Sequence, residues 1–510
     1  MIKKNALLLF FVIVKFVIQY QLVNPVYELH RDEFLHLDQG KHLAAGYLSV
    51  PPLSSWIAWI IAQLGNSAFW IRFFPALFGA ITLVLVWKAM EELKAGTFAL
   101  VAGAIGILFS ALLRVNILFQ PNSFDIMAWT FIYFCIVKYC NRAQNKWLWL
   151  AAIGFAFGIL NKYNIAFQFL GLIPALILTK QRTVFLKPVF YAALLLALVI
   201  ISPNIYWQYK NGFPVIHHMQ ELTSTQLVNV SRSHFLSEQL LYFIGSLFVL
   251  LAGFISIVFY KPFKRYLVLL YAFFFTMGIF LYFQAKGYYA IGLYPIFLSF
   301  GAVWFEGWTM AGWKKYVVRP LLLVIPLLLF IPFVKLAFPV KSPEEIVADS
   351  GKQQKMGLHR WEDGKDHPIS QDFADMQGWK EMTAIVDSVY ATLADKEHTL
   401  VRCDNYGQTG AINYYSKFPG INALSYNADY IFWFPKNIQW KNMIMVLDED
   451  DDDPGRKAER PYFDSIYFAG KVNNEFAREK GTAVYVLTGA TDTLTKIILQ
   501  EVKEEQDQYQ

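Results

Sequence analysis

The chain has 510 residues, of which 56% are hydrophobic and 17% aromatic, while only 16% are charged. This composition excludes a soluble multidomain enzyme and is typical of a protein that crosses a membrane many times. The net charge of +6 does not indicate a nucleic-acid partner, because the basic residues fall mostly in short loops between apolar segments. The three cysteines, Cys135, Cys140 and Cys403, are too few and too irregularly spaced for a disulfide framework or a zinc site.

Apolar segments long enough to cross a membrane recur along the first 340 residues. The first follows Lys3 and Lys4 and resembles a signal peptide, but its length and the lack of a small-residue cleavage site predict an uncleaved span. We predict eleven spans, at residues 6–23, 69–88, 96–113, 123–139, 147–160, 163–179, 185–202, 238–259, 266–284, 288–308 and 317–338.

The distribution of lysine and arginine predicts the orientation of these spans. With the N-terminus in the cytoplasm, every inner loop is basic, from Lys3 and Lys4 to Lys314, Lys315 and Arg319. An odd number of spans then places everything after residue 338 outside. We therefore expect a multi-pass protein of a bacterial inner membrane with a periplasmic C-terminal domain.

This orientation gathers the polar segments on the outer face. The longest is the first loop, residues 24–68, in which apolar residues at helical spacing predict an interfacial helix over 33–47, and residues 53–64 predict a second one. The loop 203–237 carries a second group of polar and aromatic residues. A protein with its ionisable residues on one side is expected to do its chemistry there.

The last third of the chain has a different character. Residues 341–380 are polar and rich in turn formers, which predicts a linker with one helix. Residues 381–510 alternate helical and strand-like segments, which predicts a small soluble α/β domain. We expect helices at 379–395 and 410–417, strands at 399–403, 443–447 and 482–487, and a further run at 465–469. The acidic run 448–453 is more typical of a solvated loop than of a calcium site.

Two carboxylates, Asp32 and Glu33, begin the first predicted interfacial helix. They could act on a substrate, or they could simply cap the helix and oppose its dipole. A third carboxylate, Asp125, lies at the outer edge of the fourth span, where it must pair or face a cavity, and Arg114 is the partner that the sequence offers.

Two outer lysines stand in apolar surroundings, Lys162 in LNKYN and Lys286 in QAKGYY. A cation there suits a phosphate or pyrophosphate leaving group, whereas the alternative is a lysine that snorkels to lipid headgroups. Tyr288 and Tyr289 beside Lys286 favour a binding site. The pair His217 and His218 is weak as a metal motif, because sequence neighbours rarely bind one ion together.

Several segments together resemble a known family. They are HRDEFLHLDQGKHLAAGYLSVPPL at 30–53, LNKYN at 160–164, SPNIYWQYKNGFPVIHHM at 202–219, AKGYYAIGLYP at 285–295, ISQDFADMQGW at 369–379, NYGQTGAINYYSK at 405–417 and GTAVYVL at 481–487. The ordered set is similar to the polyprenyl-phosphate-sugar-dependent glycosyltransferases of the GT-C superfamily, of the glycosyltransferase family 39 type. The branch is that of the protein O-mannosyltransferases and the lipid A aminoarabinose transferases.

The resemblance implies roles for individual residues. Asp32 matches the catalytic first-loop carboxylate, with Glu33 beside it and Asp125 as a second acidic position. Substrate contacts are expected from His30, Arg31, Lys162, Lys286, Tyr288 and Tyr289, with Lys286 at the donor phosphate. The resemblance also allows a divalent metal ion with His218 as a ligand. One departure is clear, because Ser49 and Val50 stand where aminoarabinose transferases have Glu-Lys before Pro-Pro, so that subfamily's substrate and metal site are not transferred to this chain.

The sequence therefore predicts a mainly α-helical polytopic membrane protein, with a GT-C transmembrane domain at 1–340, a linker at 341–380 and a periplasmic α/β domain at 381–510. Its expected activity is transfer of a hexosyl or pentosyl group from a polyprenyl-phosphate donor to a lipid, glycan or protein acceptor. The alternative is a transporter or flippase of lipid-linked glycans that performs no transfer. Internal repeats with interrupted helices, which are typical of transporters, are not evident in the sequence.

Overall fold

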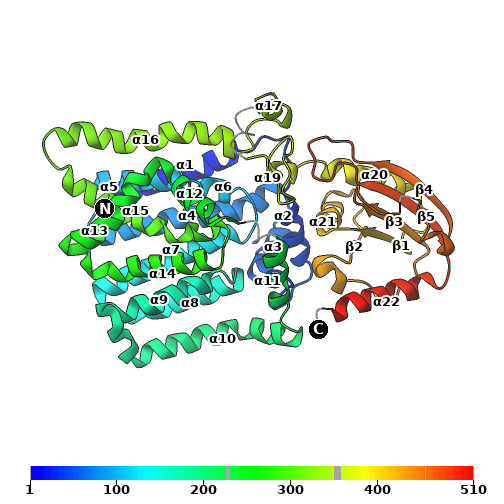
Figure 1. Ribbon diagram of the computed structural model, residues 1–510, viewed down its shortest axis with the longest axis horizontal. Coiled ribbons are helices and arrows are strands. Elements are labelled where there is room, and N and C mark those ends of the chain that lie inside the picture. The colour runs from blue at the N-terminus through cyan, green and yellow to red at the C-terminus, as the bar shows by residue number, and fades with distance from the viewer. Residues whose placement is uncertain (1, 226–229, 350–357, 454, 509–510) are drawn as a thin grey trace.

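The computed structural model describes residues 2–225, 230–349, 358–453 and 455–508. A helical body occupies one half of the molecule, and a domain built on a β-sheet lies at its end (Figure 1). The helices of the body are α1 (Ile2–Gln21), α4 (Ala68–Glu92), α5 (Thr97–Leu108), α6 (Leu112–Val115), α7 (Asn122–Arg142), α8 (Lys146–Asn161), α9 (Ile165–Ile177), α10 (Pro188–Lys210), α12 (Arg232–Leu241), α13 (Leu247–Phe259), α14 (Leu267–Tyr282), α15 (Pro295–Trp308) and α16 (Trp313–Ala337). Short 3₁₀ segments join some of them, namely η1 (Lys180–Leu186), η3 (Ile244–Ser246), η4 (Lys261–Tyr266) and η5 (Gly287–Leu293).

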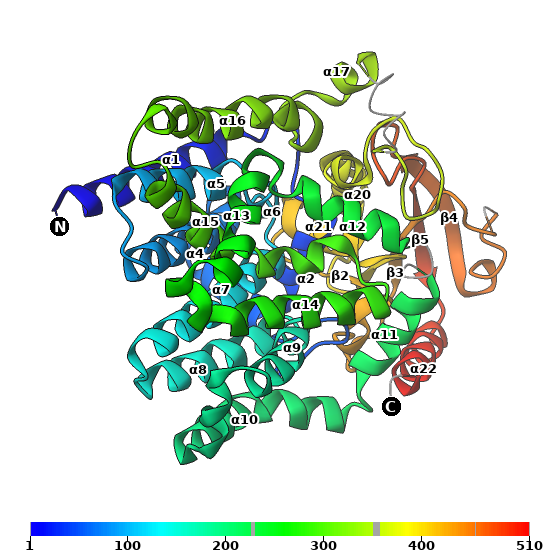
Figure 2. The same ribbon diagram turned by 60° about the vertical axis from the view of Figure 1, so that its left-hand side comes forward.

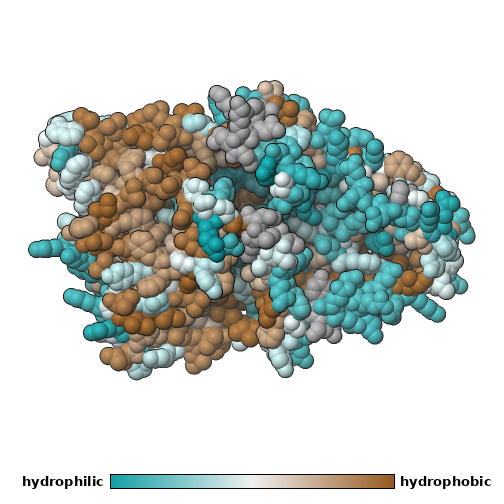
Figure 3. All heavy atoms as spheres, in the orientation of Figure 1, coloured by the Kyte–Doolittle hydropathy of each residue, from teal (hydrophilic) through white to brown (hydrophobic). Residues whose placement is uncertain are grey.

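The helical body has the surface of a membrane protein. Within the described residues, six helices are long and apolar enough to cross a bilayer, and three bent pairs would raise that number to nine. Helix α10 exposes Leu195, Leu198 and Val199, which suits contact with lipid. The body is largely apolar on its surface, whereas the sheet domain is largely polar (Figure 3). The chain is therefore a multi-pass membrane protein, and the number of eleven spans stays a prediction.

The two ends of helix α4 show how the body is oriented relative to the sheet domain. Near its start, the backbone oxygen of Asn66 accepts a 3.0 Å hydrogen bond from Tyr414 of the sheet domain. At its other end, Glu92 pairs with Lys138 and Arg142 at 2.5 and 2.8 Å. A helix of 25 residues is about 37 Å long, so this basic cluster lies across the body from the sheet domain.

The first loop forms two short helices between the body and the sheet domain, α2 (Arg31–Gln39) and α3 (Leu53–Gln63). Helix α2 is shorter than predicted and ends at Gln39, with Gly40 as its C-cap. A Cβ atom on Gly40 would lie 2.7 Å from the Cβ atom of Ala58, so glycine permits the close approach of α2 and α3. The loop 203–237 forms the end of α10 and the exposed helix α11 (Pro214–Thr225).

The sheet domain contains five strands in the order β2-β1-β3-β5-β4. Strands β1, β2 and β3 are parallel, whereas β5 pairs antiparallel with both β3 and β4. The elements are α17 (Pro343–Ala348), α19 (Gln371–Ala374), α20 (Trp379–Thr392), β1 (Thr399–Cys403), α21 (Tyr406–Tyr415), β2 (Ala423–Ser425), η6 (Ala428–Phe432), β3 (Asn442–Leu447), η7 (Arg460–Tyr462), β4 (Phe463–Lys471), β5 (Ala483–Ala490) and α22 (Leu494–Asp507). Strand β2 and helix α22 were not among the predicted elements.

Alternating residues of the sheet bury its two faces in different cores. Val401 and Ile444 face a core that includes α20, α21 and Phe34 of α2. Leu400 and Met443 belong to a second core that includes Ile498 of α22. The first core therefore extends from the sheet domain into the first loop.

The first loop lies between the two halves of the molecule (Figures 1 and 2), and polar contacts hold it there. Asp38 of α2 accepts 2.8 Å hydrogen bonds from Tyr430 and Asn413 of the sheet domain. The backbone nitrogen of Arg31 donates to the backbone oxygen of Asp375 at 3.0 Å. The end of the predicted linker is therefore docked on the first loop rather than extended.

Candidate active site

The N-terminus of α2 is fixed by a capping box. The side chain of His30 accepts a 3.2 Å hydrogen bond from the backbone nitrogen of Asp32, and Glu33 Oε2 accepts one of 2.7 Å from the backbone nitrogen of His30. Glu33 Oε1 accepts a further 2.7 Å hydrogen bond from the backbone nitrogen of Phe119. Both oxygens of the fully buried Glu33 thus accept hydrogen bonds from backbone donors, and its 0% exposure separates it from solvent. These contacts give Glu33 and His30 structural roles, while the catalytic role of Glu33 and the substrate contact of His30 stay predictions.

Asp32 is presented differently, because both of its oxygens meet side-chain donors. Tyr406 of α21 donates a 2.8 Å hydrogen bond to Oδ1, and Gln120 donates one of 2.9 Å to Oδ2. Burial raises the pKa of Asp32, but the charge of His30 and the hydrogen bond from Tyr406 outweigh it, so that the pKa is lowered overall. Each oxygen keeps a lone pair free for a further donor. Asp32 is therefore an ionised carboxylate that can accept a proton.

A chain of hydrogen bonds connects Asp32 with Lys162. The Lys162 ammonium donates to Asn122 Oδ1 at 2.8 Å, and Asn122 Nδ2 donates to Gln120 Oε1 at 3.0 Å. Gln120 in turn donates to Asp32. Every donor in this relay points toward the carboxylate, which is the direction in which a cation at one end stabilises an anion at the other.

Lys162 lies over the rings of two tyrosines. Its ammonium is 4.3 Å from the ring centre of Tyr289 and 5.0 Å from that of Tyr288, within the range of cation–π contacts. Burial lowers the pKa of Lys162 to about 8, with the charge of Asp125 opposing this shift and that of Lys286 adding to it. Burial raises the pKa of Tyr288 well above its usual value, and the charge of Asp32 adds to this shift. The structure thus brings Asp32, Lys162 and Tyr288 together.

Lys286 completes the basic side of the site. Its ammonium lies 3.3 Å from Glu362 Oε1. Gln239 of α12 fixes the adjacent backbone, because its amide donates to the backbone oxygen of Gly287 at 3.1 Å and accepts from the Tyr294 hydroxyl at 3.1 Å. We call Lys162, Lys286, Tyr288 and Tyr289 the basic platform. It is built by the α8–α9 connection and by η5, which are far apart in sequence.

Asp125 supports the site from within the helical body. Its oxygens accept hydrogen bonds from Trp129 at 2.9 Å and from Asn164 at 3.0 Å, and the side chain is buried. The ion pair with Arg114 that the sequence offered is not formed, since Arg114 pairs with Asp372 at 2.7 Å. Asp125 therefore anchors the α8–α9 connection through Asn164, and its catalytic role stays a prediction.

The residues around His218 do not fit a divalent metal ion. Within the described residues, no group of three or more His, Cys, Asp or Glu side chains is arranged to hold one. Burial lowers the pKa of His218, Glu221 raises it, and the charge of Lys286 lowers it further. The positive charge of Lys286 therefore opposes a second cation at this imidazole. No step of the chemistry below is therefore assigned to a metal.

Sequence reasoning missed three side chains of this site, namely Gln120, Asn122 and Tyr406. Gln120 and Asn122 stand between Arg114 and Asp125 in the sequence, and Tyr406 lies in the segment NYGQTGAINYYSK that carries the resemblance. The sequence does not mark uncharged polar residues as parts of a site, because their position next to a carboxylate is set by the tertiary structure. Arg31, predicted as a substrate contact, stacks on the Tyr406 ring at 4.3 Å, and its contact with substrate stays a prediction.

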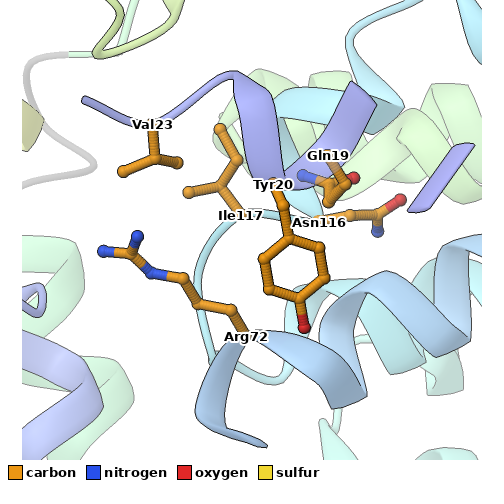
Figure 4. A pocket seen from close by; sticks show the side chains of 6 residues that line it. All are labelled: Gln19, Tyr20, Val23, Arg72, Asn116 and Ile117. Carbon is orange, nitrogen blue, oxygen red and sulfur yellow. The ribbon is translucent and has the colours of Figure 1, made fainter. Parts of the chain in front are cut away.

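A separate small pocket lies where α1, α4 and the chain after α6 meet. Its volume is about 10 Å³, and the lining side chains are those of Gln19, Tyr20, Val23, Arg72, Asn116 and Ile117 (Figure 4). This is room for about one water molecule. The pocket includes neither Asp32 nor the basic platform, so it is not the place where a sugar donor would bind.

Comparison with known proteins gives the class to which this fold belongs. Residues 49–207 match the family model described as dolichyl-phosphate-mannose-protein mannosyltransferase. The fold is that of ArnT, as the structural comparison below shows. Part of the chain thus matches this family model and the chain has an ArnT-like fold, which agrees with the resemblance to GT-C glycosyltransferases that its sequence predicts.

The particular relatives are more distant. Lipid A galacturonosyltransferase RgtD of Rhizobium johnstonii is 26% identical over 197 residues, which are 38% of this chain and 41% of the relative. The match thus spans about two fifths of the length of that relative. ArnT from Cupriavidus metallidurans bound to undecaprenyl phosphate superposes with a TM-score of 0.62 at 13% identity, over 96% of this chain and 99% of that chain. Its apo state gives a TM-score of 0.63 at 13% identity, over 94% and 98%.

Proposed function

We propose that this protein is a membrane glycosyltransferase that moves a sugar from a polyprenyl-phosphate-linked donor to a hydroxyl group of a lipid, glycan or protein acceptor. The observation that carries the proposal is the position of Asp32, an ionised carboxylate held by two donors opposite a platform with two lysines. A sugar donor with a phosphate leaving group needs a proton acceptor and a cation on opposite sides of the anomeric carbon. The names of RgtD and of ArnT bound to undecaprenyl phosphate support the same class of reaction.

In this mechanism Asp32 accepts the proton of the acceptor hydroxyl as its oxygen attacks the anomeric carbon. The new oxygen–carbon bond forms while the bond from that carbon to the phosphate oxygen breaks. The phosphate keeps the electron pair, and the ammonium groups of Lys162 and Lys286 offset its charge. A single displacement of this kind inverts the configuration of the sugar.

The sidedness of the fold suggests where the reaction takes place. The Lys138–Glu92–Arg142 cluster lies across the body from Asp32, and basic loops prefer the cytoplasm. We infer that Asp32, the basic platform and the sheet domain lie on the periplasmic side of a bacterial inner membrane, with the N-terminus in the cytoplasm. We propose that the transferred sugar is a hexosyl or pentosyl group, and a screen of labelled donors would distinguish the two.

The test is release of polyprenyl phosphate by purified protein from a set of labelled undecaprenyl-phosphate sugars, with membrane lipids and glycans as acceptors. We expect Asp32→Asn to abolish release without changing the melting temperature, because one charge is removed and the shape is kept. Asp372→Asn is the matched control, since it changes a surface carboxylate on the same face. Near-normal release by Asp32→Asn would remove Asp32 from the mechanism, and movement of intact donor across vesicles without release would favour the transporter.

A further inference from the structure

The sheet domain reaches into the candidate active site through one side chain. We propose that Tyr406 is a positioning residue for Asp32, so that the catalytic centre is completed by the C-terminal domain and does not exist in the helical body alone. The inference rests on the proposed function, because it assigns Asp32 the role of proton acceptor. It goes beyond that function in making the C-terminal domain part of the reacting site.

The contact itself is short and well supported. The Tyr406 hydroxyl lies 2.8 Å from Asp32 Oδ1, and the Arg31 guanidinium covers the Tyr406 ring at 4.3 Å. Burial raises the pKa of Tyr406 well above its usual value, and the charge of Asp32 adds to this shift, so the hydroxyl stays protonated as a donor. Arg31 and Asp32 are consecutive residues of α2 that hold the ring and the hydroxyl of the same tyrosine.

The N-terminus of α21 positions the Tyr406 side chain. Asn405 caps the helix, and its side-chain oxygen accepts hydrogen bonds from the backbone nitrogens of Gly407 and Gln408 at 2.9 and 3.1 Å. A Cβ atom on Gly407 would lie 2.7 Å from Arg31 Cγ, and one on Gly410 would lie 2.6 Å from Phe34 Cβ. Both glycines therefore allow α21 to approach α2 closely enough for Tyr406 to reach Asp32.

The two oxygens of Asp32 are held from different halves of the molecule. Gln120, at the end of the relay from Lys162, comes from the helical body, whereas Tyr406 comes from the C-terminal domain. Two donors at fixed positions prevent rotation of the carboxylate about its last bond. They also favour its charged form. Without the Tyr406 hydroxyl, Asp32 Oδ1 loses its donor and only Oδ2 is held, by Gln120.

The experiment compares Tyr406→Phe with Tyr426→Phe. Tyr426 is the matched control, because its hydroxyl also donates to a carboxylate, Glu501 at 2.7 Å, within the same domain. We expect Tyr406→Phe to lower kcat about ten- to hundredfold, which is the effect of losing one hydrogen bond to a charged group, with little change in KM for the donor. The acid limb of the pH profile is expected to move to higher pH.

A second measurement does not depend on activity. A water-soluble carbodiimide modifies protonated carboxyl groups, and mass spectrometry of the Asp32 peptide gives the pH at which modification is half complete. We expect this pH to be higher in Tyr406→Phe than in the wild type and unchanged in Tyr426→Phe. Unchanged kcat, acid limb and modification in Tyr406→Phe, or equal losses in both variants, would overturn the proposal.

The two proposals fail in different ways. If Asp32→Asn is inactive and Tyr406→Phe is normal, only the positioning role of Tyr406 fails. If Asp32→Asn keeps its activity, the role of Asp32 as proton acceptor fails, and the positioning role of Tyr406 in catalysis fails with it. The carbodiimide measurement then still reports whether the tyrosine controls the charge of Asp32.

Discussion

Gln120 Nε2 lies 2.9 Å from Asp32 Oδ2, and the oxygen of the same amide accepts a hydrogen bond from Asn122. Gln120 therefore links Asp32 to the Lys162 ammonium through a chain of hydrogen bonds in which every donor points toward the carboxylate. The amide can do this because it is both a donor and an acceptor, whereas a carboxylate in its place could only accept.

Gln120→Glu should lower the rate of transfer about ten- to hundredfold. The variant puts a second negative charge beside Asp32 and removes a donor, so the pKa of Asp32 should rise. Release of polyprenyl phosphate as a function of pH checks this, and the acid limb should move to higher pH. Gln181→Glu is the control, because Gln181 donates to the backbone of Arg265, away from Asp32. An unchanged pH profile in Gln120→Glu would contradict the relay.

Glu33→Gln should act on stability rather than on chemistry. Both oxygens of Glu33 accept backbone hydrogen bonds. In glutamine one of these oxygens is replaced by an NH2 group, which would face a backbone N–H and could not accept its hydrogen bond. We expect the free energy of unfolding to fall by about 2 kcal/mol. Thermal unfolding in detergent measures the loss, and transfer per folded molecule should stay within a few-fold of the wild type. A variant with normal stability and no transfer would restore the catalytic role predicted from the sequence.

The stability of the docked C-terminal domain should depend on pH through Asp429. This buried carboxyl accepts hydrogen bonds from Gln39 at 2.8 Å and from the backbone nitrogen of Leu48 at 2.9 Å, and burial raises its pKa from 3.8 to about 6. Between these values the folded protein keeps a proton that the unfolded chain loses. The free energy of unfolding should therefore fall as the pH rises from about 4 to about 6, by up to about 3 kcal/mol from this group.

Asp429→Asn isolates that contribution, because the amide does not titrate. Melting temperatures at pH 4.5 and 6.5 should differ less in the variant than in the wild type. Equal differences in the two proteins would show that Asp429 titrates normally in the folded state.

Lys286→Gln should weaken binding of the sugar donor. Lys286 lies on the basic platform, and the loss of one cation facing a phosphate should raise KM for the donor about tenfold, with a smaller effect on kcat. Steady-state kinetics with the labelled donor measure both constants. Lys341→Gln is the control, since Lys341 pairs with Asp349 on the surface of the C-terminal part. The same change in KM in both variants would argue against a specific phosphate contact.

Much of the fold follows from local pattern. Each predicted apolar segment is helical, because backbone groups in a bilayer must satisfy their hydrogen bonds within the segment. Strand β1 was predicted with the bounds Thr399–Cys403, because its apolar residues form a short run between polar turns. Strand β2 was missed because it has only three residues, and α22 because its apolar positions are spaced among many charges.

By itself, the sequence determined that this is a polytopic membrane protein and that it resembles GT-C glycosyltransferases, and it predicted a site at Asp32. Periodicity, segment length and charge distribution are local or additive, so they can be read along the chain. Only the tertiary structure decided that Glu33 caps a helix while Asp32 faces Gln120 and Tyr406. Neighbouring residues of a helix point about 100° apart, so Asp32 and Glu33 have different surroundings. The two hydrogen-bond partners of Asp32 lie 88 and 374 positions away in the sequence, so its surroundings cannot be read from the local sequence.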